Sequence, residues 1–538
     1  MKNLYKLLGS ALLIAFFAAG CDTDTLQDMN LNPNAVNTID VNYFLTAAEL
    51  SASNNGLRDD RYTDWRTNIG MCAHAIQHLA STSTGTISVG DKYLENDVEP
   101  SNAPWDHFFA GDGRVTAEII KQTGPGGYAE GHNINTRHAA RILRVLCFHR
   151  LTDWYGSIPY FEANKGIEGI FQPVYDKQKA IYTDLLKELD EACAGLSTSN
   201  LDEGFKAADY YFEGDIAKWK KFGYSLMLRL AMRVSNVDKP LATTYVTKAV
   251  AGGVMSSNDD NVIATMALGP SEWTNQNGIL RGFYPGDGGQ WSSSFLSKTL
   301  VDKLMGTNKL STADDDPRLM IFTGGIIQWT ATSVVYNQTD PLKQRGLPNG
   351  LDGAMLDAME GGPTTPYEKF SAVNPLMMQD DEPYMIMHAA ESEFLLAEAL
   401  KSGIGTGITG TVKSHYDNGV KLALQMYTIY DPSFAVSDAR VTQYLTNYPF
   451  DDAKALEMIG EQMWLSKWMN WWDAWSDYRR TGFPVLTPTN YPGNATNGQI
   501  PTKLTIPAYE ATGNPNYATG ATQPDRLSGK VWWDGGPE

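Results

Sequence analysis

Helical periodicity is the feature that most constrains how this chain can fold. From about Val41 onward, apolar residues recur at spacings of three and four, and Gly, Pro and Asn interrupt the pattern. Each such segment has one apolar face that must be buried, so the segments are expected to pack against one another. The pattern predicts helices over 41–54, 135–152, 176–196, 215–235, 241–251, 293–305, 386–401, 412–427, 438–446 and 452–477.

The predicted helices tend to come in pairs. One amphipathic segment ends near Leu400 and the next begins at Val412, and a glycine-rich turn separates them. Neither segment can bury its apolar face alone, which is typical of helical-repeat units. The turn contains a GxGxxG pattern at Gly405, Gly407 and Gly410, but a helix precedes it and not a strand, so a turn is favoured over a dinucleotide site.

The first twenty residues have the pattern of a secretory signal peptide. Lys2 and Lys6 precede an uncharged, mostly apolar run over 7–20, which ends in small residues directly before Cys21. A bilayer-spanning helix needs about 20 apolar residues, and this run is shorter. The pattern predicts cleavage before Cys21, as in the lipobox of bacterial lipoproteins, where that thiol is acylated. The alternative is an ordinary leader with an accidental cysteine.

The acidic character of the chain limits its possible partners. The formal net charge is −19 over all residues. Binding to nucleic acid or to an anionic membrane surface needs a supply of Lys and Arg, so neither partner is expected, and the membrane would be reached through the lipid alone. Residues 21–40 are polar and lack apolar periodicity, so they are expected to form a lipidated tether. Cys147 and Cys193 are interpreted as small buried residues.

Long stretches without helical periodicity are the best candidates for binding. They cover 81–134, 252–292, 306–385 and 484–538, and loops of this length are uncommon in compact domains unless they are functional. Flat aromatic rings cover the C–H face of a sugar, while polar side chains hydrogen-bond its hydroxyls. We therefore expect ligand loops near 60–110 and 270–292. The candidate ligand-binding residues are Asp64, Trp65, Arg66, Tyr93, Trp273, Tyr284, Asp287, Gln290 and Trp291.

Two other aromatic or charged groups are predicted to be structural. Trp464, Trp468, Trp471 and Trp475 are spaced by four, three and four residues, which places them on one helical stripe facing a core. The aromatic rings of the ligand loops have a similar alternative, namely that they pin the loops to the helical body. The basic residues at 137, 141 and 144 share one helix face and are expected to be salt-bridged.

No motif identifies a catalytic or metal centre. His74 and His78 are four residues apart, but Ala75 stands where a zinc protease has its glutamate. Asp314, Asp315 and Asp316 lack the spacing of an EF-hand, so no metal is expected there. A pair of glycosidase carboxylates stays an open alternative, because many acidic residues are present and nothing marks two of them.

Short motifs along the whole chain are weak singly and specific in their order. They are the Cys21 lipobox, Asn32-Pro-Asn34, Asp153-Trp-Tyr-Gly156, Tyr211-Phe-Glu-Gly-Asp215, Asp316-Pro-Arg318, Glu393-Phe-Leu-Leu-Ala-Glu-Ala399 and Trp472-Asp-Ala-Trp-Ser-Asp-Tyr-Arg-Arg-Thr-Gly-Phe-Pro484. Together they resemble the SusD/RagB family of nutrient-binding outer-membrane lipoproteins. Near the C-terminus the chain departs from the family pattern, with Lys503 where an Arg is common and Ile506-Pro507 in place of a Tyr-Pro pair.

The resemblance implies a mostly α fold: a tetratricopeptide-like helix-pair superhelix with long irregular loops and few short strands, formed by residues 41–538 as a single domain. It also implies a surface-exposed, lipid-anchored protein of the outer membrane that binds oligosaccharides and acts with a TonB-dependent SusC-like porin, without a cofactor and without enzymatic activity. Peptide cargo is the alternative within the family. A surface glycoside hydrolase is the alternative outside it.

Overall fold

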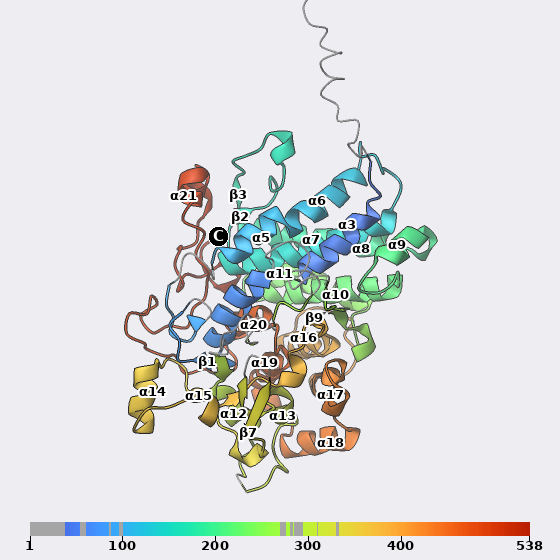
Figure 1. The fold of residues 1–538 in the computed structure, drawn as a ribbon. Helices are drawn as coiled ribbons and strands as arrows, with labels where there is room; N and C mark the ends of the chain where they lie inside the picture. The colour runs from blue at the N-terminus through green and yellow to red at the C-terminus, as the bar shows by residue number, and fades with distance from the viewer. Residues whose placement is uncertain are drawn as a thin grey trace, which may run out of the picture. The chain divides into compact units, whose positions relative to one another are not determined.

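Helices form the frame of the chain, as the periodicity predicted (Figure 1). The computed structural model describes residues 38–53, 61–85, 88–95, 101–269, 276–279, 283, 294–308, 310–329 and 333–538. Residues Val41–Glu538 form one compact unit. Its longer helices are α3 (Asn42–Ala52), α5 (Ala103–Ala110), α6 (Asp112–Gln122), α7 (Ile134–Tyr155), α8 (Gln178–Gly195), α10 (Ile216–Arg233), α11 (Lys239–Gly252), α14 (Gly353–Glu360), α16 (Ala389–Ser402), α17 (Val412–Gln425), α18 (Asp438–Asn447), α19 (Ala455–Ser466) and α20 (Trp471–Thr481).

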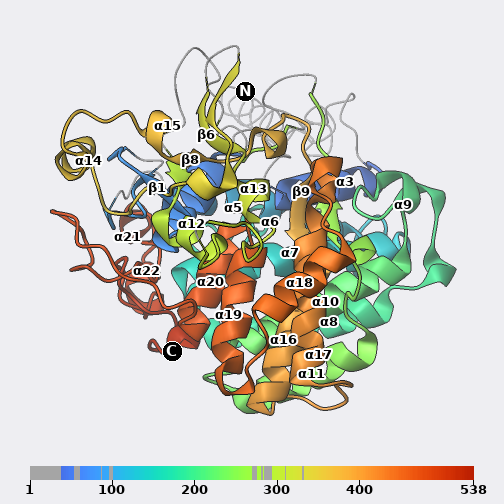
Figure 2. The same cartoon turned by 90° about the horizontal axis from the view of Figure 1, so that it is seen from below.

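Consecutive helices pack against each other in pairs. Helix α7 packs on α8, α10 on α11 and α16 on α17, and α16 and α17 lie side by side in both views (Figures 1 and 2). Close approach within the last pair depends on Gly419, because a Cβ there would lie 2.6 Å from Cε1 of Phe394. The expected fold class, mostly helical with helix pairs and few short strands, is confirmed.

Local sequence signals explain where several helices begin. The carboxylate of Asp215 accepts the N–H groups of Ala217 and Lys218 at the start of α10. Thr411 and Ser414 form a reciprocal capping box at the start of α17. These side chains satisfy N–H groups that have no partner inside the helix, which stabilises each helix end.

Three predicted helix boundaries were wrong, each for a tertiary reason. The predicted helix 452–477 is divided into α19 and α20, because the chain turns between them with Met469 at a left-handed φ of 72°. The predicted helices 293–305 and 386–401 each begin with strand residues that pair with a distant segment before the helix starts. The stretch 81–134, expected to be irregular, contains α5 and α6, whose apolar faces pack on other helices.

Short antiparallel strands connect segments that are distant in the sequence. Strand β1 pairs with β5, β2 with β3, and β4 with β9, while β6 pairs with both β7 and β8. The strands are β1 (Leu79–Ser81), β2 (Ile158–Pro159), β3 (Tyr175–Asp176), β4 (Val262–Ala264), β5 (Ser294–Leu296), β6 (Gly325–Trp329), β7 (Val334–Gln338), β8 (Ser371–Ala372) and β9 (Tyr384–Met387).

Shorter helical elements complete the described part of the chain. A ten-residue π-helix, η1 (Asp64–Ala73), packs against α20. The short α-helices are α4 (Arg61–Thr63), α9 (Glu203–Ala208), α12 (Lys298–Leu304), α13 (Leu319–Phe322), α15 (Pro366–Lys369), α21 (Glu510–Gly513) and α22 (Tyr517–Gly520).

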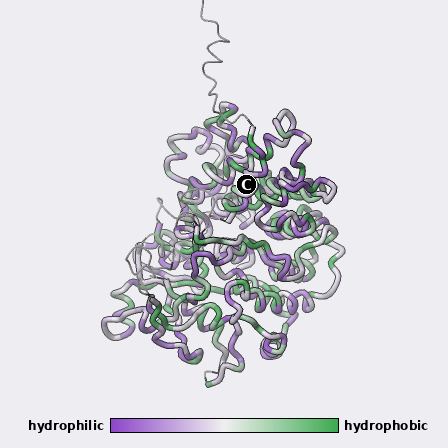
Figure 3. Tube along the Cα trace, turned by 45° about the vertical axis from the view of Figure 1, so that its right-hand side comes forward, coloured by the Kyte–Doolittle hydropathy of each residue, from purple (hydrophilic) through white to green (hydrophobic). Residues whose placement is uncertain are grey.

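Hydrophobic and hydrophilic residues alternate in short stretches along the helices and do not form long apolar blocks (Figure 3). This is the pattern of helices that bury one face and expose the other. Within the described ranges, no helix combines the length and apolar character required to span a membrane.

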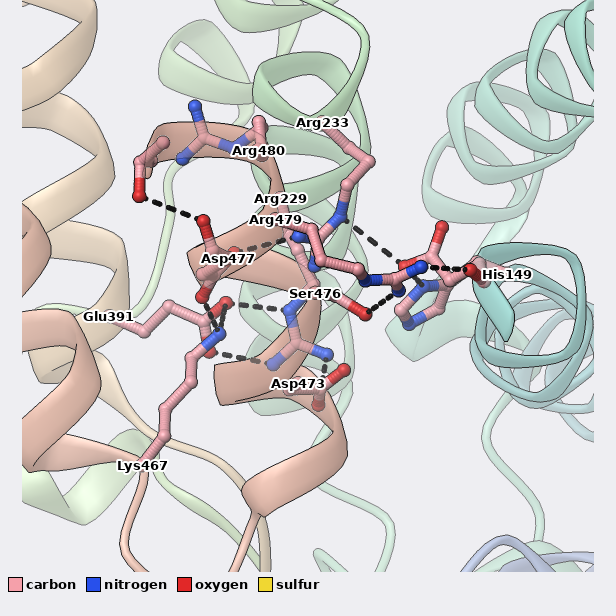
Figure 4. A network of polar contacts seen from close by, with 12 residues as sticks. His149, Arg229, Arg233, Glu391, Lys467, Asp473, Ser476, Asp477, Arg479 and Arg480 are labelled. Carbon is pink, nitrogen blue, oxygen red and sulfur yellow. Dashed lines mark hydrogen bonds and ion pairs between the residues drawn. The ribbon is translucent and has the colours of Figure 1, made fainter. Parts of the chain in front are cut away.

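A buried ionic network joins four helices at the centre of the unit (Figure 4). Arg229 of α10 contacts Glu391 of α16 and Asp473 of α20. Arg233, one turn later on α10, contacts Asp153 of α7 at 3.3 Å and Asp477 of α20 at 2.9 Å. Because an unpaired charge is costly to bury, these contacts specify which helices meet and in which register.

Candidate ligand-binding site

A two-stranded ladder joins the middle of the first expected ligand loop to the segment that follows the second. Strand β1 lies shortly after η1, and β5 directly follows the loop near 270–292. Their register pairs Leu79 with Leu296 and Ser81 with Ser294. Two segments separated by more than two hundred residues in sequence therefore lie side by side at one place in the fold.

Within the second loop, Asn277 and Phe283 contact other parts of the folded unit. The backbone N–H of Asn277 donates to the carbonyl of Asp380 at 2.8 Å, and its side-chain amide donates to the carbonyl of Glu382 at 3.0 Å. Phe283 is buried, and its ring centroid lies 6.3 Å from that of Trp471 on α20. The aromatic stripe of the helical body thus supports the second loop.

An aromatic and cationic cluster lies at the start of η1. The rings of Tyr62 and Trp65 meet edge to face with centroids 5.4 Å apart. The guanidinium carbon of Arg66 lies 4.4 Å from the centre of the Tyr62 ring, within the range of a cation–π contact. All three side chains are half-buried. The cluster therefore presents ring edges, a ring face and a hydrogen-bond donor at a partly open position.

Asp64 and Tyr93 lie beneath the surface, where they support other residues. The Asp64 carboxylate accepts hydrogen bonds from Asn68 at 2.9 Å and from the hydroxyl of Tyr384 at 3.1 Å, and the residue is fully buried. The Tyr93 hydroxyl accepts the backbone N–H of Thr489 at 3.0 Å, and burial raises the pKa of this phenol. Both side chains are therefore engaged with other residues of the fold, and their assignment as ligand-binding residues stays a prediction.

The remaining candidate residues lie outside the described part of the chain. This applies to Trp273, Tyr284, Asp287, Gln290 and Trp291 of the second loop, and also to the lipidation candidate Cys21. Their assignment as ligand-binding or lipidated residues stays a prediction.

A polar pocket that sequence reasoning missed lies beside the β1–β5 ladder. It has a volume of about 500 Å³, and Gln77, Lys298, Asn349 and Asn490 contribute to its walls. Thr489, which contacts Tyr93, lines it as well. These residues come from four separate segments without a shared motif, so only the fold relates them. Amide, ammonium and hydroxyl groups of this kind are suited to binding the hydroxyls of a sugar.

The tryptophans and cysteines predicted to be structural are buried in the fold, and the arginines contact other residues. All four tryptophans of the 464–475 stripe are buried, and the indole N–H groups of Trp464 and Trp475 donate to backbone carbonyls at 3.0 and 2.8 Å. Of the predicted salt-bridged face, Arg141 forms ion pairs with Glu188 and Glu191. Arg137 instead donates to the backbone carbonyl of Ile120, and Arg144 to the hydroxyl of Tyr160. Cys147 and Cys193 are buried, as predicted.

His78 and Asp316, two residues considered as metal-ligand candidates, contact other side chains of the fold. His78 is buried against the rings of Trp464 and Trp468, and burial followed by the charge of Arg318 lowers its pKa well below the usual value. Asp316 pairs with Arg318 at 2.7 Å. No group of metal-ligating side chains is found within the ranges the structure describes.

Comparisons with known proteins agree with this architecture. A family model named SusD-like, with the description "Starch-binding associating with outer membrane", matches residues 33–507. A solved structure titled as a chitin-binding protein is 28% identical, with a TM-score of 0.75, and the alignment covers 92% of this chain and all of the other. A chitin-binding SusD homolog from Flavobacterium johnsoniae is 21% identical, with a TM-score of 0.70, over 92% of this chain and 98% of that one.

A further structure, titled Bacteroidetes AC2a SusD-like, superimposes with a TM-score of 0.77 at 23% identity, over 92% of this chain and 100% of that chain. At this level of identity the likeness shows the fold alone. A comparison with curated protein sequences gave no match.

Proposed function

The chain belongs to the SusD-like family, and from this premise we propose that it is a cell-surface lipoprotein that binds oligosaccharides and hands them to a TonB-dependent SusC-like porin for import. In this role the acylated Cys21 anchors the protein to the outer membrane, and residues 21–40 serve as the tether. The protein binds its cargo without altering it, because the work of transport is done by the partner.

The observation that carries the proposal is the pairing of β1 with β5, which follow the first aromatic cluster and the second candidate loop in the sequence. One loop contributes the cluster of Tyr62, Trp65 and Arg66, and the other contains the aromatic candidates near Trp291. Rings of this kind stack on the C–H faces of sugars, and the guanidinium and amide groups hydrogen-bond the hydroxyl rim. The polar pocket beside the ladder offers further donors and acceptors.

The experiment is a calorimetric titration of the purified chain with starch and chitin oligosaccharides and with neutral peptides of similar length. Trp65→Ala and Trp291→Ala are expected to lower the glycan affinity about tenfold each, since one aromatic contact contributes about 0.5–1.5 kcal/mol beyond the area it buries and tenfold corresponds to about 1.4 kcal/mol. Tyr43→Ala is the control, because Tyr43 is an exposed aromatic residue on α3 outside both loops.

Three outcomes contradict the proposal in different ways. Peptide binding without glycan binding would assign the family's alternative cargo. Unchanged glycan affinity in both tryptophan variants would reject the chosen loops. Chromatography of the glycans after incubation tests for catalysis: turnover that is lost when one carboxylate is neutralised would show a glycoside hydrolase.

A further inference from the structure

A further pocket is lined by residues of α5, of the segment that links β2 and β3, and of α21. Figure 1 shows where these elements lie. The pocket has a volume of about 520 Å³. We call it the acidic aromatic pocket, because its walls carry four aromatic rings and two carboxylates. These residues are Trp105, Asp106, Phe109, Phe171, Tyr509 and Glu510.

The aromatic walls come from three segments and contain one ring that packing does not explain. Trp105 and Phe109 have centroids 5.1 Å apart on α5, and Trp105 stacks on Tyr175 at 6.1 Å. Phe171 lies in the β2–β3 segment and is 82% exposed. Phe171 also lines the pocket, so its ring is accessible to a molecule bound there.

Hydrogen bonds between the segments hold the pocket in shape. The side-chain amide of Asn164 donates to the carbonyl of Phe109 at 3.1 Å, which joins the β2–β3 segment to α5. The side-chain amide of Asn514 donates to the carbonyl of Pro173 at 2.8 Å, which joins the same segment to the end of α21. The three walls are therefore tied to one another without a ligand.

Two tyrosines orient the carboxylates. The hydroxyl of Tyr509 donates to Oδ1 of Asp106, and the hydroxyl of Tyr175 donates to Oε2 of Glu510 at 2.7 Å. Burial and these carboxylates raise the pKa of both phenols, so they stay protonated donors. Each carboxylate uses one oxygen in this contact, which leaves the other oxygen for a ligand.

No ion pair involves these carboxylates within the described part of the chain. Among the described residues that line the pocket there is no Lys, Arg or His. Aromatic ring faces also attract cations. Both features of the wall therefore favour a positively charged group.

We propose that the acidic aromatic pocket binds the protonated amine of an amino sugar, a second saccharide site in addition to the loops of the β1–β5 ladder; this inference rests on the proposed glycan-binding function. The ammonium group lies between the carboxylates of Asp106 and Glu510, and the C–H face of the sugar ring packs on Phe171. A metal ion fits less well, because a hard cation needs six or more oxygen ligands and the rings supply none.

The test compares two trisaccharides that differ in one group: a glucosamine trimer with free amines and its N-acetylated counterpart. Calorimetry of the full chain at pH 6 and low salt is expected to show the free-amine trimer binding about tenfold more tightly, the effect of one charge-assisted contact. The double variant Asp106→Asn with Glu510→Gln is expected to abolish this preference. Its affinity for the N-acetylated trimer is expected to stay unchanged.

Single substitutions on one segment provide the matched control. Phe171→Ala is expected to weaken binding of the free-amine trimer several-fold, because it removes one aromatic wall. Ile167→Ala is expected to leave it unchanged, since Ile167 is on the same segment and 89% exposed but does not line the pocket. Circular dichroism of each variant checks that the fold is retained.

Equal affinity of the wild type for both trimers would overturn the inference, and so would an amine preference that persists in the double variant. A lysine tripeptide that binds while the glucosamine trimer does not would assign the pocket to a peptide and overturn the saccharide class. These failures are distinct from failure of the proposed function, which is measured by neutral glycans and by the Trp65→Ala variant.

Discussion

Arg229 and Glu391 form a bidentate ion pair between α10 and α16. Nε and Nη2 of Arg229 each donate to a different carboxylate oxygen of Glu391 at 2.6 Å, and each side chain is 1% exposed. Lys467 reaches the same carboxylate at 3.0 Å. Arg229 and Lys467 thus share the carboxylate of Glu391, while Arg229 also pairs with Asp473 and Lys467 with Asp477 (Figure 4). Because unpaired charges are costly to bury, removing the shared acid is expected to disturb the whole network.

Replacing the shared acid is expected to destabilise the protein strongly. Glu391→Gln leaves Arg229 and Lys467 with one carboxylate fewer, and breaking a buried pair from one side costs about 3–5 kcal/mol. Urea unfolding at pH 7 measures the change. The control is Asp417→Asn, which removes an exposed ion pair with Lys413 and is expected to cost less than about 1 kcal/mol. Equal losses in the two variants would contradict the importance of the buried network.

The same residue predicts how stability depends on pH. Burial alone raises the pKa of Glu391, but Arg229 and Lys467 outweigh burial and lower it from 4.5 to about 2. Because the folded-state pKa lies below the unfolded value, the stabilisation is complete above pH 4.5 and is lost as the pH falls toward 2. The difference in unfolding free energy between wild type and Glu391→Gln is therefore expected to shrink over this interval. A difference that stays constant from about pH 5 to about pH 2 would be inconsistent with an ionised Glu391.

Gly419→Ala tests the close packing of α16 on α17. Replacing Gly by Ala inside a helix normally stabilises it by up to about 1 kcal/mol. Here the added Cβ would lie 2.6 Å from Cε1 of Phe394, so we expect a loss of about 1–3 kcal/mol from overpacking. Thermal unfolding measures it. Gly353→Ala on α14 is the control, since its Cβ would meet nothing within 4 Å and it is expected to be neutral or slightly stabilising. A gain in stability for Gly419→Ala would show that the helices are further apart.

Cys21→Ser tests the anchor. Without the thiol the chain cannot be acylated, so we expect the variant to disappear from the washed outer-membrane fraction. Cell fractionation and intact mass spectrometry of wild type and variant measure the location and the lipid. Cys72→Ser is the matched control, because Cys72 is a buried thiol of the folded unit and has no part in anchoring. A mature wild-type protein with an unmodified Cys21 would refute the predicted lipidation.

Residue order alone established which faces of most segments are apolar, and this was enough to predict the helical frame. The spacing of the tryptophans from 464 to 475 predicted that they are buried, and they are, although the break at Met469 distributes them over two helices and the turn between them. The basic face of α7 predicted the ion pairs of Arg141, because such patterns depend on neighbouring residues. The order of the short motifs indicated the family. Local patterns of this kind survive folding, since each segment keeps its own periodicity.

Which distant segments meet became apparent only in the folded chain. The pairing of β1 with β5, the break at Met469 and the burial of Asp64 all depend on residues far away in the chain. The acidic aromatic pocket likewise joins Trp105 to Glu510, from opposite ends of the folded unit's sequence, without a motif. Such contacts form only when many segments pack together with complementary shape and charge. No single stretch of sequence is therefore sufficient to predict them.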